Sequence, residues 1–151
     1  MTITIGFTTV ADSISKMTVT GVTMKDIDKI PDAGQMICPV MFPQPHGFVT
    51  GTSVERMSLG GGGTALMDMS YVLNYVYLHA ETGTGVSSFD VYSGIITNLA
   101  VIIKAILTND NITGCVDMEL NTIGEIGTVV DPAGNSFWGV LISFKILEQV
   151  Q

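Results

Sequence analysis

The stretch SFDVYSGIITNLAVIIKAIL, residues Ser88–Leu107, decides the fold. Its large apolar side chains recur at the i, i+3, i+4, i+7 spacing that places residues on one helix face: Tyr92, Ile95, Ile96, Leu99, Ile102, Ile103 and Ile106. Ser87 or Ser88 can cap such a helix, and Asp90 lies in its first turn, where the helix dipole favours a negative charge. At about 1.5 Å per residue the helix is roughly 30 Å long, so we expect it to cross a sheet.

The segments on both sides of this helix have the composition and alternation of strands. The predicted strands are residues 36–42, 48–59, 65–79, 115–123, 126–130 and 137–150. The second and third are joined by LGGGGT, which predicts a hairpin with a glycine-rich tip. Near the start of the chain, Val10, Ile14 and Met17 are spaced for a short helix.

These segments predict one α+β domain that covers residues 1–151. We expect a mostly antiparallel sheet, one long crossing helix, a short N-terminal helix and a long β-hairpin extension. The length is enough to bury a hydrophobic core without disulfides or metal ions. Cys38 and Cys115 are predicted to be reduced, buried thiols, because free cysteine behaves as a small hydrophobic residue, and a long-range disulfide between them is the alternative.

The long strand at 65–79 is partly apolar on both faces, with Asp68, Ser70 and Asn74 interrupting one of them, whereas a strand of a sheet with one solvated face would have a clean polar side. The last strands can supply the surface that the helix needs, through the faces Trp138–Ile146 and Val116–Leu120. The Met and Tyr face of the long strand is then left for a neighbouring subunit. The predicted interface residues are Met67, Met69, Tyr71, Tyr75 and Tyr77, with Gly60, Gly61, Gly62 and Gly63 at the hairpin tip.

The chain is acidic and poor in charge. It has 6 Lys and Arg against 14 Asp and Glu, a net charge of −8, and its 13% of charged residues is about half the usual share. This balance does not suit a protein that grips phosphate backbones, although an acidic wall lets DNA slide past it. Asp117 and Glu119 share one strand face and predict an acidic strip that faces solvent or a lumen. A metal site there has no predictable third ligand.

Catalytic motifs are missing from the sequence. Its two histidines, His46 and His79, lie in a turn and at a strand end, and there is no GxSxG nucleophile motif. LGGGGT lacks the Gly-Lys-Ser/Thr of a phosphate-binding loop. The apolar run GIITNLAVIIKAIL is too short to span a membrane. We therefore predict no enzyme activity, no cofactor, no metal and no membrane partner.

The order of the parts resembles that of a known family. An N-terminal helical segment leads into IPDAGQMICPVMFPQP, then come a two-stranded extension, a long helix and the closing segment DPAGNSFWGVLISFKILEQV. This resembles the tail terminator proteins (tail completion or head–tail joining proteins) of long-tailed bacteriophages of the lambda-like group, over most of the chain.

The resemblance implies a homo-oligomeric ring, usually a hexamer, that caps the tail tube and stops its polymerisation. Its partners would be the tail tube protein and the head–tail connector proteins, with DNA only as passing cargo. The protein would be found in the tail or neck of the virion, and in the host cytoplasm during assembly. Members of the family carry no catalytic residues, so none is transferred to this chain.

Two alternatives stay open at this point. The first is another ring protein of the same virion, either a tail tube or a neck connector subunit. The second belongs to another class: a small ligand-binding α+β domain in which Tyr71, Tyr75, Tyr77 and Trp138 line a pocket.

Overall fold

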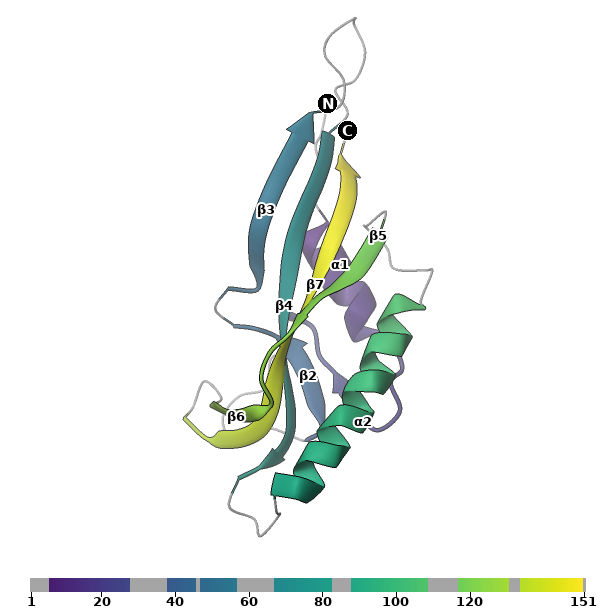
Figure 1. The fold of residues 1–151 in the computed structure, drawn as a ribbon. Helices are drawn as coiled ribbons and strands as arrows, with labels where there is room; N and C mark the ends of the chain where they lie inside the picture. Colours follow the sequence, from purple (N-terminus) through teal and green to yellow (C-terminus); the bar gives the residue numbers. More distant parts are fainter. Residues whose placement is uncertain are drawn as a thin grey trace, which may run out of the picture.

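The computed structural model describes residues 6–27, 38–45, 47–56, 67–82, 88–108, 117–130 and 134–150. Within them, a mixed sheet of seven strands packs with two helices, so the predicted α+β class is confirmed (Figure 1). The elements are α1 (Phe7–Ser15), β1 (Thr23–Met24), β2 (Val40–Pro43), β3 (Val49–Arg56), β4 (Met67–Glu81), α2 (Ser88–Leu107), β5 (Asp117–Ile123), β6 (Gly127–Val130) and β7 (Ser136–Val150).

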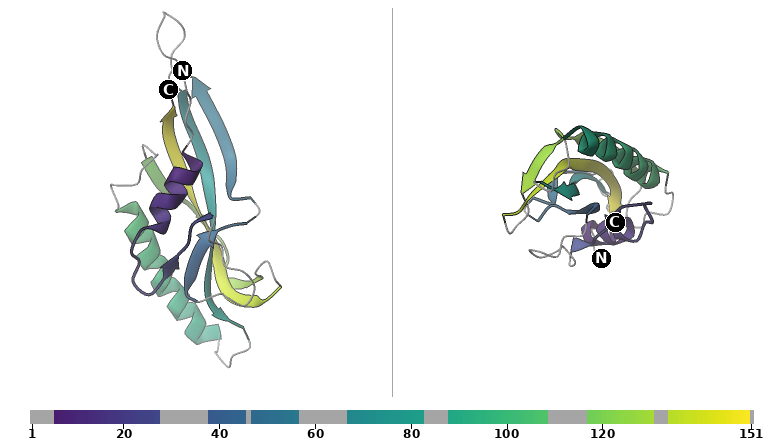
Figure 2. Two further views of the ribbon diagram at one scale, coloured as in Figure 1. Left: turned by 180° about the vertical axis from the view of Figure 1, so that it is seen from behind. Right: turned by 90° about the horizontal axis from the view of Figure 1, so that it is seen from below.

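Two long antiparallel strands, β4 and β7, form the centre of the sheet, and each has 15 residues. On one side, β2 and β3 pair in succession with the outer edge of β4. On the other side, β5 and β6 pair with the outer edge of β7. These pairs are all antiparallel, whereas β1 pairs in parallel with β2, which makes the sheet mixed. Figure 2 shows from below how strongly β7 curves.

The break between β2 and β3 has a local cause. β2 ends at Pro43, opposite Tyr75, the N–H of Gln44 still donates to the carbonyl of Asn74 at 3.0 Å, and Pro45 then has no backbone N–H to donate. The side-chain amide of Asn74 fills the gap by donating to the carbonyl of Gly47 at 3.0 Å and to the hydroxyl of Thr50 at 2.9 Å. Two short strands therefore take the place of one long edge strand.

The main core lies between the two helices and one face of the sheet. The register of β4 and β7 sets Tyr71 opposite Ile146, Tyr75 opposite Ile142 and Tyr77 opposite Val140. We call this surface the helix-covered face: residues 69, 71, 73, 75 and 77 of β4 with 138, 140, 142, 144, 146 and 148 of β7. α1 packs toward Tyr71, and α2 packs toward Tyr77.

The buried stripe of α2 differs from the prediction. It consists of Val91, Ile95, Leu99, Ile102 and Ile106, with Ile103 partly buried. Tyr92 is 57% exposed and Ile96 is 45% exposed, so their predicted place in the core is wrong. The stripe is rotated around the helix axis toward Val91, because the helix packs on Tyr77 with the side that carries Asn98. Among the described helices, none is long and apolar enough to span a membrane.

The opposite surface of the sheet is called here the open face: residues 68, 70, 72, 74, 76 and 78 of β4 with 137, 139, 141, 143, 145 and 147 of β7. A small apolar cluster covers one end of it, made of Val40, Phe42, Val76, Leu78 and Phe137. Near its middle, Asn121 and Thr122 bond to the hydroxyl of Ser143 at 3.1 and 2.8 Å. Leu141, Lys145 and Leu147 are exposed.

Candidate functional site

The predicted interface residues of β4 lie in the core. Met69, Tyr71, Tyr75 and Tyr77 are at most 3% exposed. The ring of Tyr71 meets that of Phe7 edge-on at 4.6 Å, and the ring of Tyr75 meets that of Phe48 at 5.5 Å. The prediction that these side chains contact a neighbouring subunit is therefore wrong. Gly60, Gly61, Gly62 and Gly63, and the side chains of Met67 and Asp117, lie outside what the structure describes.

The reason for the error is the neighbour of β4. If the helix packs on the last strands alone, as predicted, the Met and Tyr face of β4 stays uncovered. In the structure β4 is adjacent to β7 over nearly its whole length, so both strands contribute to one apolar surface under the same helices. The same packing argues against a ligand pocket lined by Tyr71, Tyr75, Tyr77 and Trp138, because these side chains all pack into this core.

A buried carboxylate, Glu148, ties α1 to the end of β7. The backbone N–H of Gly6 donates to its two oxygens at 3.0 and 3.3 Å, and the hydroxyl of Tyr71 also donates to it. Gly6 supplies no side-chain cap to α1, so Glu148 satisfies the helix N-terminus from another part of the chain. The signal in the sequence is a glutamate that continues the apolar alternation of β7, and this role of Glu148 was not predicted.

A second polar cluster joins α2 to β4. The amide of Asn98 donates to the Tyr77 hydroxyl at 2.8 Å, and this hydroxyl lies 2.7 Å from Nδ1 of His79. Burial raises the pKa of Tyr77 to about 12, and burial lowers the pKa of His79. A Cβ atom at Gly94 would lie 2.6 Å from Nε2 of His79, so the glycine lets the helix approach this closely.

Neither cluster has the composition of a catalytic or metal site. The hydrogen-bond partners described at His79 are a tyrosine and, through it, an asparagine, and Glu148 accepts hydrogen bonds from Gly6 at the N-terminus of α1 and from Tyr71. In the described part of the chain, no group of three or more His, Cys, Asp and Glu side chains could hold a metal ion. Both clusters therefore position helices on the sheet.

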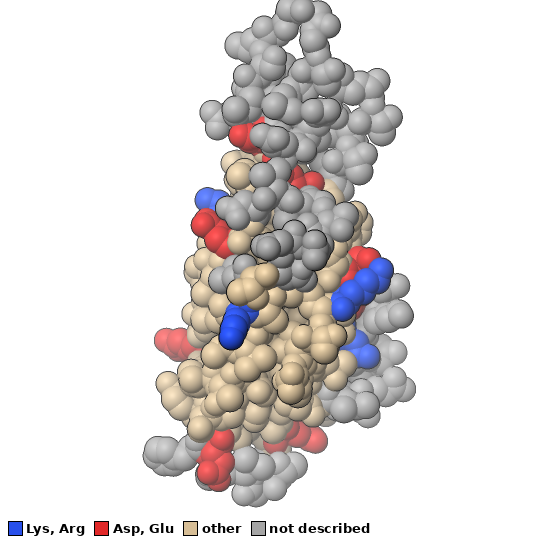
Figure 3. Space-filling model, turned by 90° about the vertical axis from the view of Figure 1, so that its right-hand side faces the viewer, with Lys and Arg blue, Asp and Glu red and all other residues tan. Residues whose placement is uncertain are grey.

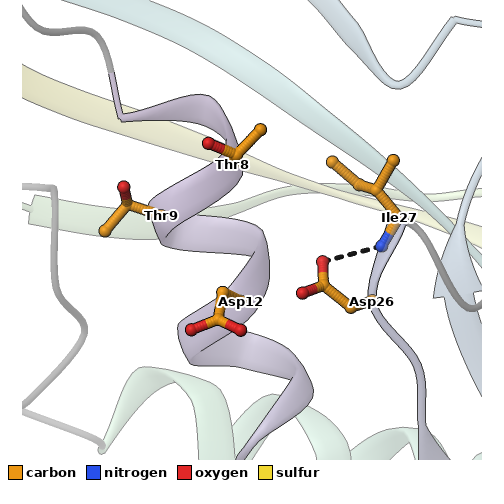
Figure 4. Close-up of a pocket in the computed structure, with 5 residues that line it drawn as sticks. All are labelled: Thr8, Thr9, Asp12, Asp26 and Ile27. Atoms are coloured by element: carbon orange, nitrogen blue, oxygen red, sulfur yellow. Dashed lines mark hydrogen bonds between the residues drawn. The ribbon is translucent and has the colours of Figure 1, made fainter.

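One surface pocket lies between α1 and the segment after β1, with a volume of about 460 Å³ (Figure 4). Thr8, Thr9, Asp12, Asp26 and Ile27 line it. Asp12 forms an ion pair with Lys16 at 2.8 Å, and Asp26 accepts a hydrogen bond from the backbone N–H of Ile27 at 2.7 Å. The two carboxylates are thus bound by groups of their own segments.

Of the predicted acidic strip, the side chain of Glu119 is described, and it lies on the open face of the sheet at β5. Glu119 is exposed and stands opposite Lys145 in the register of β5 and β7. Met118 and Leu120 point the other way and pack against the core, as their alternation predicts. Lys145 therefore lies beside Glu119 on this face. That Glu119 faces a lumen stays a prediction.

The outward side of α2 has a stretch without charged residues. Between Asp90 and Lys104 the helix has no charged residue. Its exposed residues there include Tyr92, Ile96 and Val101. Figure 3 shows this side of the molecule, with uncharged atoms across the centre of the lower half and most charged atoms near the margin. An uncharged patch with exposed large apolar side chains is typical of a protein–protein contact.

Comparison with known proteins does not assign the chain to a family. No protein-family model matches the sequence, and no curated protein is significantly similar to it.

Proposed function

We propose that this protein is a structural virion subunit that forms a ring, caps the tail tube of a long-tailed bacteriophage and joins it to the head connector. The observation that carries the proposal is the pair of strand edges on opposite sides of one sheet, at β3 and β5. In the described sheet, β3 pairs only with β4, and β5 pairs only with β7. A closed ring of copies would cover both edges.

The directions of the strands suit such a ring. β3 is antiparallel to β4, β4 to β7, and β7 to β5, so β3 and β5 run in opposite directions. Rotation about an axis parallel to the strands would bring β3 of one copy beside β5 of the next as an antiparallel pair. Val54 on β3 is 56% exposed, and Ile123 on β5 is also exposed, so apolar side chains are available at both edges.

The finer features of the proposal follow from the same arrangement. β3 and β4 would form the hairpin arm that reaches the tail tube or the next subunit, with Gly60–Gly63 at its tip. α2 would cross the back of the sheet and stiffen each subunit. Glu119 on the open face would face the lumen through which DNA passes, where a negative charge limits contact with phosphates.

The mass of the native assembly tests the ring, and a tube polymerisation assay tests the capping. We expect native mass spectrometry to give a closed ring, usually of six copies in this family. We expect tail tubes grown with the protein to stop at a limited length. A strict monomer at high concentration that leaves tube growth unchanged would refute the proposal.

Edge variants connect the assay to the geometry. Val54→Lys and Ile123→Lys each place a lysine at an exposed position of an edge strand, and we expect both to reduce ring formation. Thr20→Lys is a matched control, because Thr20 is exposed in a turn outside the sheet edges. Rings that form equally well in all three variants would exclude these edges as the contact.

A tail tube or neck connector subunit is the second candidate, because the same two edges would serve any ring. Electron microscopy of the pure protein distinguishes a tail tube subunit from a tail terminator. A tube protein would polymerise alone into long cylinders, whereas a terminator would stop at single rings.

A further inference from the structure

The outward side of α2 carries one line of exposed residues: Asp90, Ser93, Thr97, Ala100 and Lys104. Their spacing of three, four, three and four residues keeps them on a single stripe along the helix. We call it the outward stripe. Its middle consists of small side chains, which allow another helix to approach closely, and its ends carry opposite charges.

The middle of the outward stripe can be buried at little cost. The hydroxyl of Thr97 donates to the carbonyl oxygen of Ser93 at 2.9 Å, so covering it leaves no unsatisfied donor. The exposed side chains of Tyr92, Ile96 and Val101 flank the stripe and add apolar area to any contact. The hydroxyl of Thr97 therefore stays hydrogen-bonded when a helix–helix contact centred on it excludes water.

The charges at the two ends indicate what covers the stripe. Asp90 and Lys104 are each seven residues from Thr97, or about 10 Å along the axis at about 1.5 Å per residue. In an antiparallel pair with a two-fold axis near Thr97, Asp90 of each helix comes level with Lys104 of the other. A parallel pair would set Asp90 beside Asp90 and Lys104 beside Lys104. The charges thus complement a second copy of the same helix in one orientation.

We propose that α2 packs antiparallel against α2 of a second copy of this chain, about a two-fold axis near Thr97. The contact is isologous, so it saturates at two copies. It goes beyond the ring proposed above, whose head-to-tail contacts use the edges of the sheet and a different part of the surface. If both contacts exist, the α2 contact joins subunits of two rings back to back.

Cysteine cross-linking tests the axis. In a background with Cys38→Ala and Cys115→Ala, Thr97→Cys places two thiols next to each other across the two-fold axis. We expect disulfide-linked dimers under mild oxidation to form at least about tenfold faster than with Thr20→Cys, whose position is exposed but lies outside α2. Equal rates for the two variants would overturn the proposal.

A charge swap tests the orientation. Asp90→Lys or Lys104→Asp alone turns both reciprocal attractions into repulsions, and we expect each to weaken the dimer about tenfold in sedimentation at low ionic strength. The double variant Asp90→Lys with Lys104→Asp restores the opposite charges and should recover the affinity to within about threefold. Circular dichroism verifies that α2 is folded in all three. A double variant as weak as the singles would overturn the antiparallel arrangement.

The outcomes separate this contact from the proposed function. Closed rings without Thr97→Cys cross-linking would refute the α2 contact alone. Cross-linked dimers that never exceed two copies would support the α2 contact and refute the ring.

Discussion

The two faces of β4 are both partly apolar in the sequence, but only one of them is buried all the way from Met69 to Tyr77 in the structure. The residues on the helix-covered face, Met69, Tyr71, Leu73, Tyr75 and Tyr77, are all buried. On the open face, Asp68, Ser70, Val72 and Asn74 are only half-buried, and Val76 and Leu78 alone are enclosed, at one end. An apolar face of a strand thus does not identify a contact between subunits, because the neighbouring strand and the helices above it decide whether the face is free.

The comparison is tested most strongly by two adjacent residues of β7. Ile142 on the helix-covered face is 1% exposed, and Leu141 on the open face is 46% exposed. Ile142→Ala should lower the free energy of unfolding by about 4 kcal/mol, because it opens a cavity in the core. Leu141→Ala should cost about 0.5 kcal/mol. Urea denaturation measures both, and similar losses would mean that the two faces are equally packed.

The next largest difference in stability is expected from substitutions at two paired glycines. Gly139 of β7 and Gly127 of β6 are opposite each other in the register. A Cβ at Gly139 would overlap the backbone oxygen of Tyr77, whereas a Cβ at Gly127 meets nothing within 4 Å. We expect Gly139→Ala to destabilise by about 3 kcal/mol through overpacking, and Gly127→Ala to have almost no effect. Thermal unfolding of the pair measures this, and equal melting temperatures would contradict it.

A third test of the difference between the two faces uses Glu148, which lies at the α1 end of the helix-covered face. Glu148→Ala leaves the N–H of Gly6 and the hydroxyl of Tyr71 without their acceptor, so we expect a loss of about 2 kcal/mol. Hydrogen exchange should report faster opening of α1 than of α2 in this variant. Glu119→Ala, at an exposed position of β5, is the control and should be neutral. Unchanged exchange of α1 would mean that Glu148 does not hold it.

The smallest expected effect is a pH dependence from His79. Burial lowers its pKa in the folded state below the ordinary value of 6.5, so the folded protein binds fewer protons than the unfolded chain. This contribution to stability is complete above 6.5 and is lost as the pH falls through the pKa of folded His79. When the pH is lowered from about 7.5 to about 5.5, the melting temperature of His79→Gln should therefore fall less than that of the unchanged protein. His46, the only other histidine, is present in both proteins and cancels. Equal losses would exclude His79 as the source.

The sequence predicted the elements far better than their contacts. The helical spacing at 88–107 coincides with α2, and the alternation at 137–150 with β7, because each pattern reports the geometry of a single segment. The partner of β4 could not be predicted, because alternation is the same whichever strand lies alongside. The error on Tyr92 and Ile96 has a similar cause, since a helix with many apolar residues can be rotated to bury either Val91 or Tyr92.

The position of a contact surface was not predicted from the sequence. The low content of charge predicts a covered surface, and the stretch of α2 between Asp90 and Lys104 has no charged residue. The Met and Tyr residues chosen for it are in the core instead. Glu148 and His79 were not predicted to hold helices, because their partners are far away in the sequence: Gly6 bonds to Glu148, and Asn98 reaches His79 only through Tyr77.

The sequence by itself determined that α2 is a helix, that β4 and β7 are long strands and that the chain has little charge for its surface. Those properties depend on the spacing and type of residues within single segments. The tertiary structure decided which face of β4 is buried, which side of α2 faces outward and where the edges of the sheet lie. These properties depend on the register between β4 and β7 and on the packing of both helices against one face, which no single segment contains.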